Sequence, residues 1–458
     1  MTKSCAMDMT SGPLMRKLII FTVPVMLASC LQLLFNAADI VVVGKFAGDN
    51  ALAAVGSNAP LVSLLTNLFI GISAGANVAV ANFLGSQDEE AVSQTVHTSV
   101  LLGFVGGILL MIIGIMYVEP ILILMDSPEN VLPLASLYMR IFSLGLPAMM
   151  VFNFCAAVLR ATGDTQHPLY YLIIAGILNV ILNLVFVIYL HMSVAGVALA
   201  TIISEYVSAI LVMRQLMHAD GMIKVELRKL RFTGSKLRRI LHVGIPAGIQ
   251  SSLFALSNVV LQSAINSFGE VVVAGNTASS NVEGFVYTAM NSVYQASMNF
   301  TGQCYGAGKY KRIHKVLFSS LGLVTMVGVI LGGFVCLVGP QLLYVYTDNP
   351  EVVEIAYHRL LILCLPYFIC GWMDTIVGVM RGMGYGIMPM IVSLMGSCAF
   401  RVVWVNTYFV AHPTLGVLYA SWPISWTITF ALHIVCYCAI WQFNRKRYLE
   451  RETDEPDA

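Results

Sequence analysis

QLLFNAADIVVVG, residues 32–44, places a carboxylate inside a long apolar run. Gln32, Asn36 and Asp39 follow one another at spacings of four and three, which puts them on one face of an α-helix. A charge near the middle of a membrane costs roughly 2.5–3.5 kcal/mol on insertion scales, so it is tolerated where it faces a polar cavity or a partner. Asp39 is therefore either an ion or proton site with an amide shell, or a hydrated residue near the outer end of its helix; we expect the first.

The composition is that of a membrane protein. The chain has 458 residues, of which 58% are hydrophobic and 11% charged, against roughly 25% charged in soluble domains. A membrane-spanning helix needs about 20 apolar residues. We predict an all-α polytopic protein in the lipid bilayer with twelve spans, at 17–43, 52–81, 93–117, 133–157, 168–190, 194–216, 239–266, 272–302, 315–339, 354–379, 388–410 and 415–441.

Basic residues orient these spans. With both termini in the cytoplasm, only Lys45, Arg140, Arg359 and Arg401 of the 25 Lys and Arg residues fall outside cytoplasmic loops and flanks. The basic run at 220–239 is read as an anchor beside anionic lipid rather than a nucleic-acid site. The net charge of +1 gives no nucleic-acid footprint either.

The chain repeats itself after six spans. Matching residues occur at shifts of 219 to 222, as in Pro24 and Pro246, Asn36 and Asn258, Arg160 and Arg381, Gly163 and Gly384, and Pro168 and Pro389. An even number of spans gives both halves the same orientation, so we predict two six-helix bundles related by a pseudo-two-fold axis along the membrane normal, with a central cleft. The expected domains are bundles at 1–219 and 240–443, a linker at 220–239 and a cytoplasmic tail at 444–458.

The repeat is broken at the carboxylate, because the position equivalent to Asp39 is Leu261. This asymmetry predicts that the coupling chemistry lies in the first half. Asn179 and Asn183 share a face of the fifth span and either join helices or complete the shell of Asp39. The predicted cation-coupling set is therefore Asp39, Asn36, Asn179 and Asn183, and Pro24 is a candidate hinge.

Further polar residues lie within the spans, mostly in the second half. The candidates for the substrate cleft are Gln32, Gln250, Asn258, Gln262, Glu283, Tyr287, Asn291, Tyr294, Met298, Asp374 and Arg401. Arg401 is the only cation predicted well inside a span, so we expect it to pair with Glu283 or Asp374. The acids are either structural or face the substrate, and Glu205 in the sixth span is a weaker candidate of the same kind.

Enzymatic motifs are weak. GISAG at 71–75 matches G-x-S-x-G but lies inside a predicted span, where small residues let helices pack closely. Lys309 is followed by Tyr310 rather than Ser or Thr, so an ATP-binding loop is not indicated. The ten cysteines include no CxxC pair, so we expect neither a metal nor another cofactor. An intramembrane enzyme is a remote alternative.

Three motifs stand out along the chain: Pro24-x(11)-Asn36-x-x-Asp39, LRATGDTQHP at 159–168 and its echo MRGMGYGIMP at 380–389. They resemble the multidrug and toxic compound extrusion (MATE) family, and Asp39 resembles the coupling carboxylate of its bacterial DNA-damage-inducible subfamily. That subfamily often has Asn-x-x-x-Asp in the fifth span, where this chain has Asn179 and Asn183. Because the second carboxylate is missing, the resemblance implies that more of the coupling depends on Asp39.

The resemblance implies a secondary active antiporter. It would export small organic, often cationic, compounds in exchange for H+ or Na+, by alternating access between the two bundles. We expect it to act as a monomer, without ATP, in the cytoplasmic (inner) membrane of a bacterium. The alternative is a lipid-linked saccharide flippase of the same superfamily, which ranks second because only Arg401 is predicted well inside the membrane.

Overall fold

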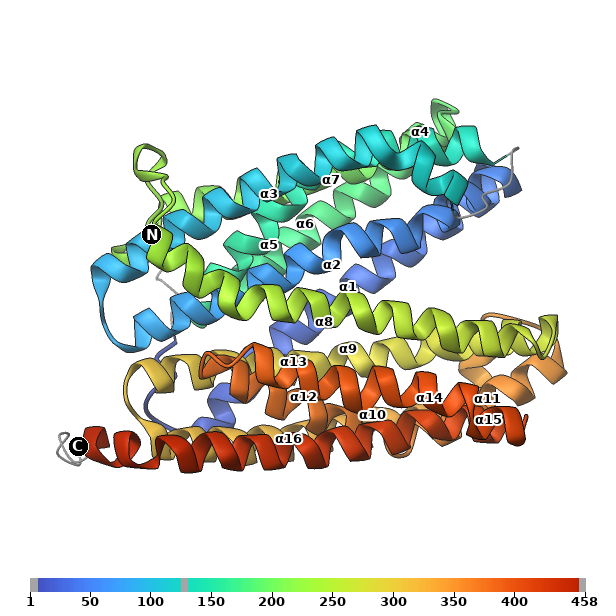
Figure 1. Ribbon diagram of the computed structural model, residues 1–458. Helices are drawn as coiled ribbons and strands as arrows, with labels where there is room; N and C mark the ends of the chain where they lie inside the picture. Colours follow the sequence, from blue (N-terminus) through green and yellow to red (C-terminus); the bar gives the residue numbers. More distant parts are fainter. Residues whose placement is uncertain (1–6, 125–130, 453–458) are drawn as a thin grey trace. The chain divides into compact units, whose positions relative to one another are not determined.

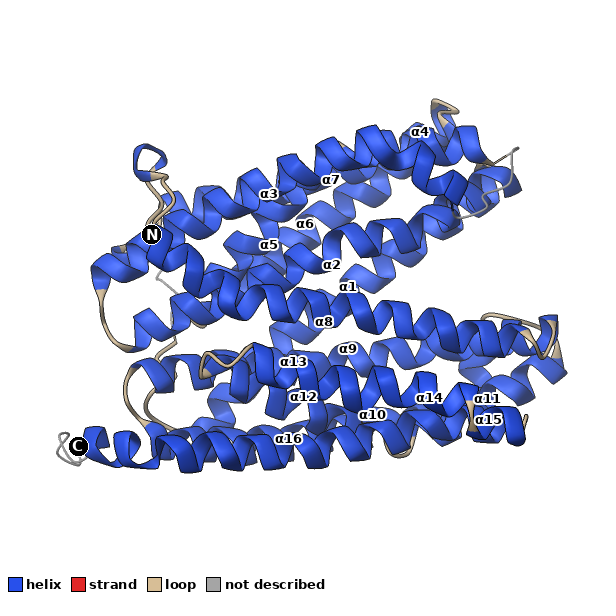
Figure 2. Ribbon diagram, viewed as in Figure 1, coloured by secondary structure: helices blue, strands red, loops and turns tan. Residues whose placement is uncertain are grey.

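The computed structural model describes residues 7–124 and 131–452, which form helices and short loops without a strand (Figures 1 and 2). The first half contains α1 (Leu14–Phe46), α2 (Asp49–Gly85), α3 (Glu89–Leu124), α4 (Leu132–Ser143), α5 (Leu146–Ala161), α6 (Gln166–Asn183), η1 (Leu184–Tyr189) and α7 (Ser193–Met217). The second contains α8 (Gly234–Asn266), α9 (Glu270–Gly306), α10 (Tyr310–Leu343), α11 (Pro350–Cys364), α12 (Tyr367–Gly382), α13 (Ile387–Ser393), η4 (Leu394–Ala399), α14 (Phe400–Asn406), α15 (Tyr408–Ala411) and α16 (Leu415–Glu452). Every predicted span coincides with one of these helices or with consecutive helices.

Two predicted spans are each broken into a bent pair. The span at 133–157 consists of α4 and α5, bent by 47°, and the span at 354–379 consists of α11 and α12, bent by 46°. Pro147 lies in the first turn of α5, and Pro366 caps the N-terminus of α12. Proline lacks a backbone N–H and restricts the residue before it, so it ends the preceding helix and starts the next. The two breaks fall at matching points of the repeat.

The twelve spans differ in polarity. Within the described residues, nine helices are long and apolar enough to cross a membrane, or eleven if each bent pair counts as one span. The remaining predicted span is α9, which has 37 residues but is not among them. Its length suits a span, and polar residues such as Asn276, Ser279, Glu283 and Asn291 lower its hydropathy. Helix α9 is therefore, besides α1, a span whose polar side chains could form a functional site.

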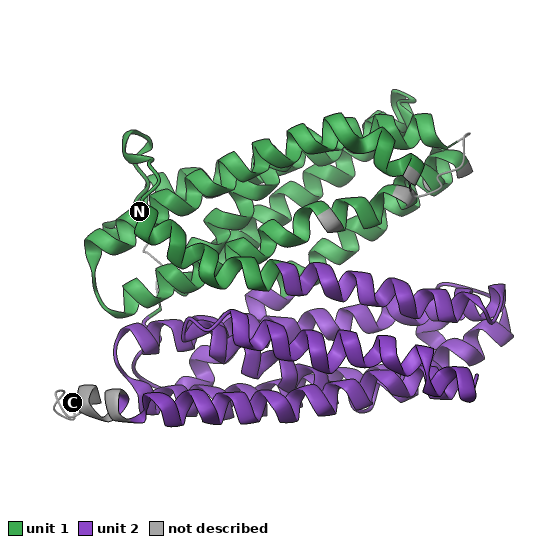
Figure 3. Ribbon diagram, in the orientation of Figure 1, with its two compact units in different colours: residues 1–7, 27–248 green, residues 8–26, 249–458 purple. Residues whose placement is uncertain are grey.

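The described chain divides into two compact units. Unit 1 holds Met7 and Leu27–Gly248, and unit 2 holds Asp8–Met26 and residues 249–452 (Figure 3). This division differs from the predicted bundles at 1–219 and 240–443. Within α1 and α8 the chain passes from one unit to the other at Met26 and Gly248, each two residues after a helix-interior proline, Pro24 or Pro246.

The linker between the halves is packed on unit 1. Helix α8 begins at Gly234, so the predicted linker at 220–239 ends within it. Val225 is buried, and its N–H donates to the carbonyl of Leu216 (3.0 Å). The Glu226 N–H donates to His97 Nε2 (3.0 Å) on α3. The predicted tail at 444–458 is helical to Glu452, where α16 ends, and 453–458 lie outside the described residues.

The GISAG segment lies inside α2 and packs it against α8. A Cβ added at Gly71 would lie 2.2 Å from the backbone N of Gly248, and one at Gly75 would lie 2.3 Å from the carbonyl O of Ile240. The Ser73 hydroxyl donates to the Ile70 carbonyl of its own helix (2.7 Å). The prediction that these small residues serve close helix packing is confirmed.

Candidate functional site

Asp39 is linked to two other helices of unit 1 through amide side chains. The Asn183 Nδ2 group on α6 donates to Asp39 Oδ1 (2.5 Å) and to Asn179 Oδ1 (3.2 Å). Asn179 Nδ2 donates in turn to Thr201 Oγ1 on α7 (3.4 Å). Asn183 and Asn179 are 0% and 6% exposed, whereas Asp39 is half-buried. The structure thus brings three of the four predicted coupling residues together and adds Thr201, which sequence reasoning missed.

A glycine brings α1 and α6 close at this point. Gly176 lies on the same face of α6 as Asn179 and Asn183, at spacings of three and seven. A Cβ added to it would lie 1.8 Å from the ring of Phe35 on α1. Asn183 is the last residue of α6, and the π-helical segment η1 follows it. Such segments occur frequently at functional sites.

The other polar residues of the α1 stripe are not part of this network. Gln32 and Asn36 are exposed, and within the described residues no hydrogen bond joins either of them to Asp39. They share a helix face with Asp39, as predicted, but Gln32 lies about two turns and Asn36 about one turn from the level at which Asn183 meets Asp39. Pro24 lies inside the continuous helix α1.

Glu283 in unit 2 has a cationic partner. Arg359 Nη2 on α11 lies 2.9 Å from Glu283 Oε1 on α9, and Arg359 Nη1 donates to Ser279 Oγ (2.8 Å). The prediction that Arg401 pairs with Glu283 or Asp374 is wrong. Arg401 Nε instead donates to Ser425 Oγ on α16 (2.9 Å).

Arg381 links α12 to two further helices of unit 2. Its Nη1 donates to the Tyr294 hydroxyl on α9 (2.7 Å), and its Nη2 donates to Gln250 Oε1 on α8 (2.9 Å). The Tyr294 hydroxyl lies 3.8 Å from the sulfur of Met298. Arg359, Arg381 and Arg401 are 3%, 6% and 3% exposed. Arg401 is thus one of three buried arginines among the described residues of unit 2.

Within the described residues, no hydrogen bond joins the remaining cleft candidates of unit 2 to Arg381. Gln262 accepts from Asn276 (3.2 Å) and donates to Asn266 (2.9 Å) at one end of α8. Asp374 interacts electrostatically with both Tyr287 and Arg381. Asn291 accepts from Gln295 (3.4 Å) on its own helix, and Asn258 is exposed.

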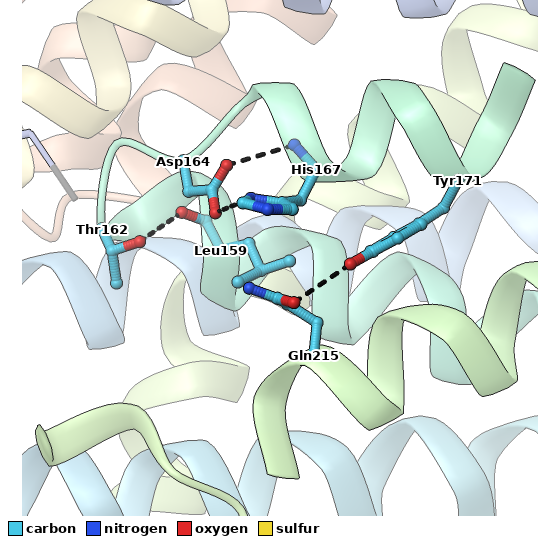
Figure 4. Close-up of polar contacts among 6 residues, drawn as sticks. All are labelled: Leu159, Thr162, Asp164, His167, Tyr171 and Gln215. Atoms are coloured by element: carbon cyan, nitrogen blue, oxygen red, sulfur yellow. Dashed lines mark hydrogen bonds and ion pairs between the residues drawn. The ribbon is translucent and has the colours of Figure 1, made fainter. Parts of the chain in front are cut away.

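The LRATGDTQHP motif forms the turn between α5 and α6 (Figure 4). The His167 N–H donates to Asp164 Oδ1 (3.2 Å), and the His167 ring Nδ1 lies 2.5 Å from Asp164 Oδ2. One turn further along α6, the Tyr171 hydroxyl donates to Gln215 Oε1 on α7 (3.1 Å). The motif therefore caps α6, and Tyr171 just beyond it ties α6 to α7 at the end of unit 1 where α6 begins.

Sequence signals existed for some of the missed residues. Arg381 belongs to the repeated R-x-x-G motif, and Thr201 precedes Glu205 by one helical turn on a common face. Arg359 lies near the start of the predicted span at 354–379, so it was not counted as well inside that span. In the described part of the chain no three His, Cys, Asp or Glu side chains gather in a way that could hold a metal ion.

Comparison with known proteins gives a consistent result. A family model described as MatE matches residues 24–185 and 246–405, one match in each half of the repeat. The chain is 28% identical to a Bacillus subtilis protein named "Probable multidrug resistance protein YoeA", over 93% of this chain and 94% of that one. It is 26% identical to a Shewanella oneidensis protein named "FAD transporter", over 77% and 79%.

A solved structure has the same fold. It is described as the outward-facing conformation of a multidrug resistance MATE family transporter of the MOP superfamily. The likeness has a TM-score of 0.88 at 22% identity and covers 99% of each chain. The all-helical fold predicted from the repeated spans is thereby confirmed.

Proposed function

We propose, because this chain belongs to the MatE family of multi-pass membrane transporters, that it exports organic compounds, often cationic drugs, in exchange for a small cation. As a transporter of this family it is not an enzyme. We further propose that it works as a monomer in the cytoplasmic membrane of a bacterium, with both ends of the chain in the cytoplasm. The basic residues counted from the sequence support that orientation.

The coupling proposal rests on the groups that surround the Asp39 carboxylate. Its carboxylate lies on an apolar helix and meets the neutral amide of Asn183, and within the described residues it makes no ion pair. A carboxylate held in a membrane without a fixed counter-charge is suited to a mobile cation. The donated N–H group satisfies the carboxylate while that cation is absent.

We propose H+ as the coupling ion. The Asn183 amide presents a nitrogen donor to Asp39, whereas Na+ needs several oxygen ligands. One observation favours Na+ as the second candidate, because the buried Oδ1 atom of Asn183 has no hydrogen-bond partner and would serve as an oxygen ligand. Loading either ion onto Asp39 neutralises its charge.

The proposed transport cycle is alternating access with mutual exclusion of ion and substrate. Loading Asp39 repacks α1, and the change moves along that helix toward Pro24. The chain leaves unit 2 for unit 1 at Met26, two residues beyond that proline. A proline removes one backbone hydrogen bond and so weakens the helix there. This placement supports the hinge predicted at Pro24.

Unit 2 supplies the proposed substrate contacts. Tyr287 and Asp374 offer an aromatic face and a carboxylate to an organic cation. The three buried arginines favour a second candidate, an anionic cargo such as a lipid-linked saccharide. Arg359 is, however, neutralised by Glu283, and Arg381 already donates to Tyr294 and Gln250. We therefore keep organic cations first.

The proposal is tested in a drug-sensitised bacterium that expresses the full chain. Asp39→Asn should abolish resistance and the efflux of rhodamine 6G at an unchanged amount of protein in the membrane. Glu119→Gln is the matched control, because Glu119 forms an exposed ion pair with Arg140 (2.9 Å) and should leave efflux unchanged. Efflux by Asp39→Asn at the wild-type rate would refute the assignment.

A further inference from the structure

Glu205 is a second carboxylate of unit 1 that lies within an apolar helix. It is half-buried in the middle of α7. Of the residues three, four and seven positions away, Thr201 is half-buried and the others are buried, namely Ala198, Ile202, Ser208, Ala209 and Val212. Because these positions share one helix face, the Glu205 side chain points into unit 1. Its backbone carbonyl accepts from Ser208 Oγ (2.8 Å), but within the described residues its carboxylate makes no hydrogen bond or ion pair. A carboxylate in such a place is costly, which points to a function.

The groups around Glu205 leave it without a fixed counter-charge. Helices α2, α4, α5 and α6 and the segment η1 contact α7. Their described titratable or charged side chains are Tyr138 and Arg140 on α4, Cys155 and Arg160 on α5, His167, Tyr170 and Tyr171 on α6, and the exposed Tyr189 on η1. Within the described residues no ion pair joins any of them to Glu205.

The network of Asp39 ends one helical turn from Glu205. Asp39 is joined to Asn183, Asn183 to Asn179, and Asn179 to the hydroxyl of Thr201. Thr201 and Glu205 are four residues apart on α7, a spacing that makes their side chains neighbours on the helix surface. Of the groups in between, the Thr201 hydroxyl is the one that readily both accepts and donates a proton.

We infer that Glu205 is a second protonation site of unit 1, which exchanges a proton with Asp39 through Thr201. This inference rests on the proposed H+ coupling. In the exchange the O–H bond of protonated Asp39 breaks and the proton passes by way of water to the Thr201 hydroxyl, while the Asn183 and Asn179 amides stay unchanged. Thr201 gives its own proton to the Glu205 carboxylate, where a new O–H bond forms, so atoms and total charge are conserved. To take part, the Thr201 hydroxyl releases its hydrogen bond to the Val197 carbonyl (3.0 Å).

The position of Glu205 gives the exchange a direction. From Thr201, α7 runs through Glu205 toward Gln215, which meets Tyr171 near the Asp164–His167 pair (Figure 4). In the proposed orientation this end of unit 1 faces the cytoplasm. Glu205 therefore lies on the cytoplasmic side of Asp39, where an incoming proton has to leave.

Proton counting on the purified full chain tests this inference. In lightly buffered detergent, a pH indicator reports the protons released when rhodamine 6G binds. Wild type should release more protons for each bound molecule than Glu205→Gln, and Glu205→Asp should restore the difference. The pH profile of binding should lose one ionisation in Glu205→Gln. Equal release and an identical profile in wild type and Glu205→Gln would overturn the inference.

Transport measurements separate this inference from the proposed function. Under a pH gradient, Thr201→Val should slow rhodamine 6G efflux by about a hundredfold, a typical loss when a positioned proton-transfer group is removed. Thr201→Ser keeps the hydroxyl and should transport normally. If wild type fails to transport, the proposed function falls. If wild type and Thr201→Val transport equally, only the role of Thr201 and Glu205 falls, and this pair of variants decides even where Glu205→Gln does not fold.

Discussion

Asp39 in unit 1 and Glu283 in unit 2 are both carboxylates on long helices, but their neighbours differ. Asp39 accepts from the neutral amide of Asn183, whereas Glu283 lies 2.9 Å from the guanidinium of Arg359. A fixed cation keeps a carboxylate ionised and holds two helices together. A neutral amide leaves the carboxylate free to take up a mobile cation. The comparison therefore supports the proposed coupling role of Asp39 and a structural role for Glu283.

The largest effect on stability is expected in unit 2. Arg359→Met leaves Glu283 buried without its partner, and breaking such a pair costs about 3–5 kcal/mol. The variant should show a large fall in melting temperature and in folded yield. Adding Glu283→Leu should recover most of the loss, since an apolar pair of similar volume is often neutral or stabilising. An unchanged melting temperature for Arg359→Met would remove the structural half of the comparison.

The next effect tests the close approach of α1 and α6 in unit 1. Gly176→Leu pushes a side chain into Phe35 and should cost about 1–3 kcal/mol of stability, as overpacking does. It should also separate Asp39 from Asn183 and lower efflux. Gly284→Leu is the matched control, because a Cβ at Gly284 meets nothing within 4 Å. Equal melting temperatures and efflux for the two variants would mean that α1 and α6 are not held together at Gly176.

Removing the amide partner of Asp39 should have a smaller effect on stability. Asn183→Ala deletes a hydrogen bond to a carboxylate that can still take up a proton, so we expect a loss of about 1 kcal/mol. Efflux should fall although the protein stays folded. The measurement pairs a thermal melt with rhodamine 6G efflux. A loss of stability as large as that of Arg359→Met would show that Asp39 and Glu283 do not differ as proposed.

The smallest effect concerns a carboxylate outside the membrane spans. Desolvation opposes ionisation of Asp8, but hydrogen bonds from Ser11 and Thr10 and the charge of Lys17 lower its pKa to about 2. A lowered pKa means that the stabilisation is complete above the ordinary value of 3.8 and is lost as the pH falls toward 2.

The Met9 amide reports this loss, because it donates to Gln303 Oε1 (3.1 Å) next to Asp8. Its hydrogen exchange, corrected for the intrinsic pH dependence, should accelerate between pH 4 and pH 2. Asp8→Asn should exchange faster already at pH 7. No change in either case would mean that the Asp8 side chain does not fasten this turn.

The helices could be predicted from the sequence because helix length and polarity are local properties. Apolar windows located every span, and the even repeat predicted two equivalent halves. Contacts between helices join residues that are far apart in the chain, so they could not be predicted in the same way. Arg401 and Glu283 had compatible charges, but Arg359 reaches Glu283 from α11, the first helix of a bent span, and the sequence does not show which helix lies beside α9 at that level.

The residue spacing predicted which side chains of the candidate site share a helix face. Asp39, Asn179 and Asn183 meet because the polar faces of α1 and α6 lie against each other at one level of unit 1. Asn36 shares the face of Asp39 but not that level, and spacing along one helix cannot fix the height at which another helix crosses it. Thr201 was missed because a single hydroxyl in an apolar span is common.

The central claim is that a cation bound at Asp39 drives export, and proteoliposomes measure this directly. The full chain is reconstituted, and rhodamine 6G transport is followed under a pH gradient alone and then under a Na+ gradient alone. We predict transport by wild type under the pH gradient, and none above protein-free liposomes by Asp39→Asn under either gradient. Transport by folded Asp39→Asn at the wild-type rate would contradict the claim.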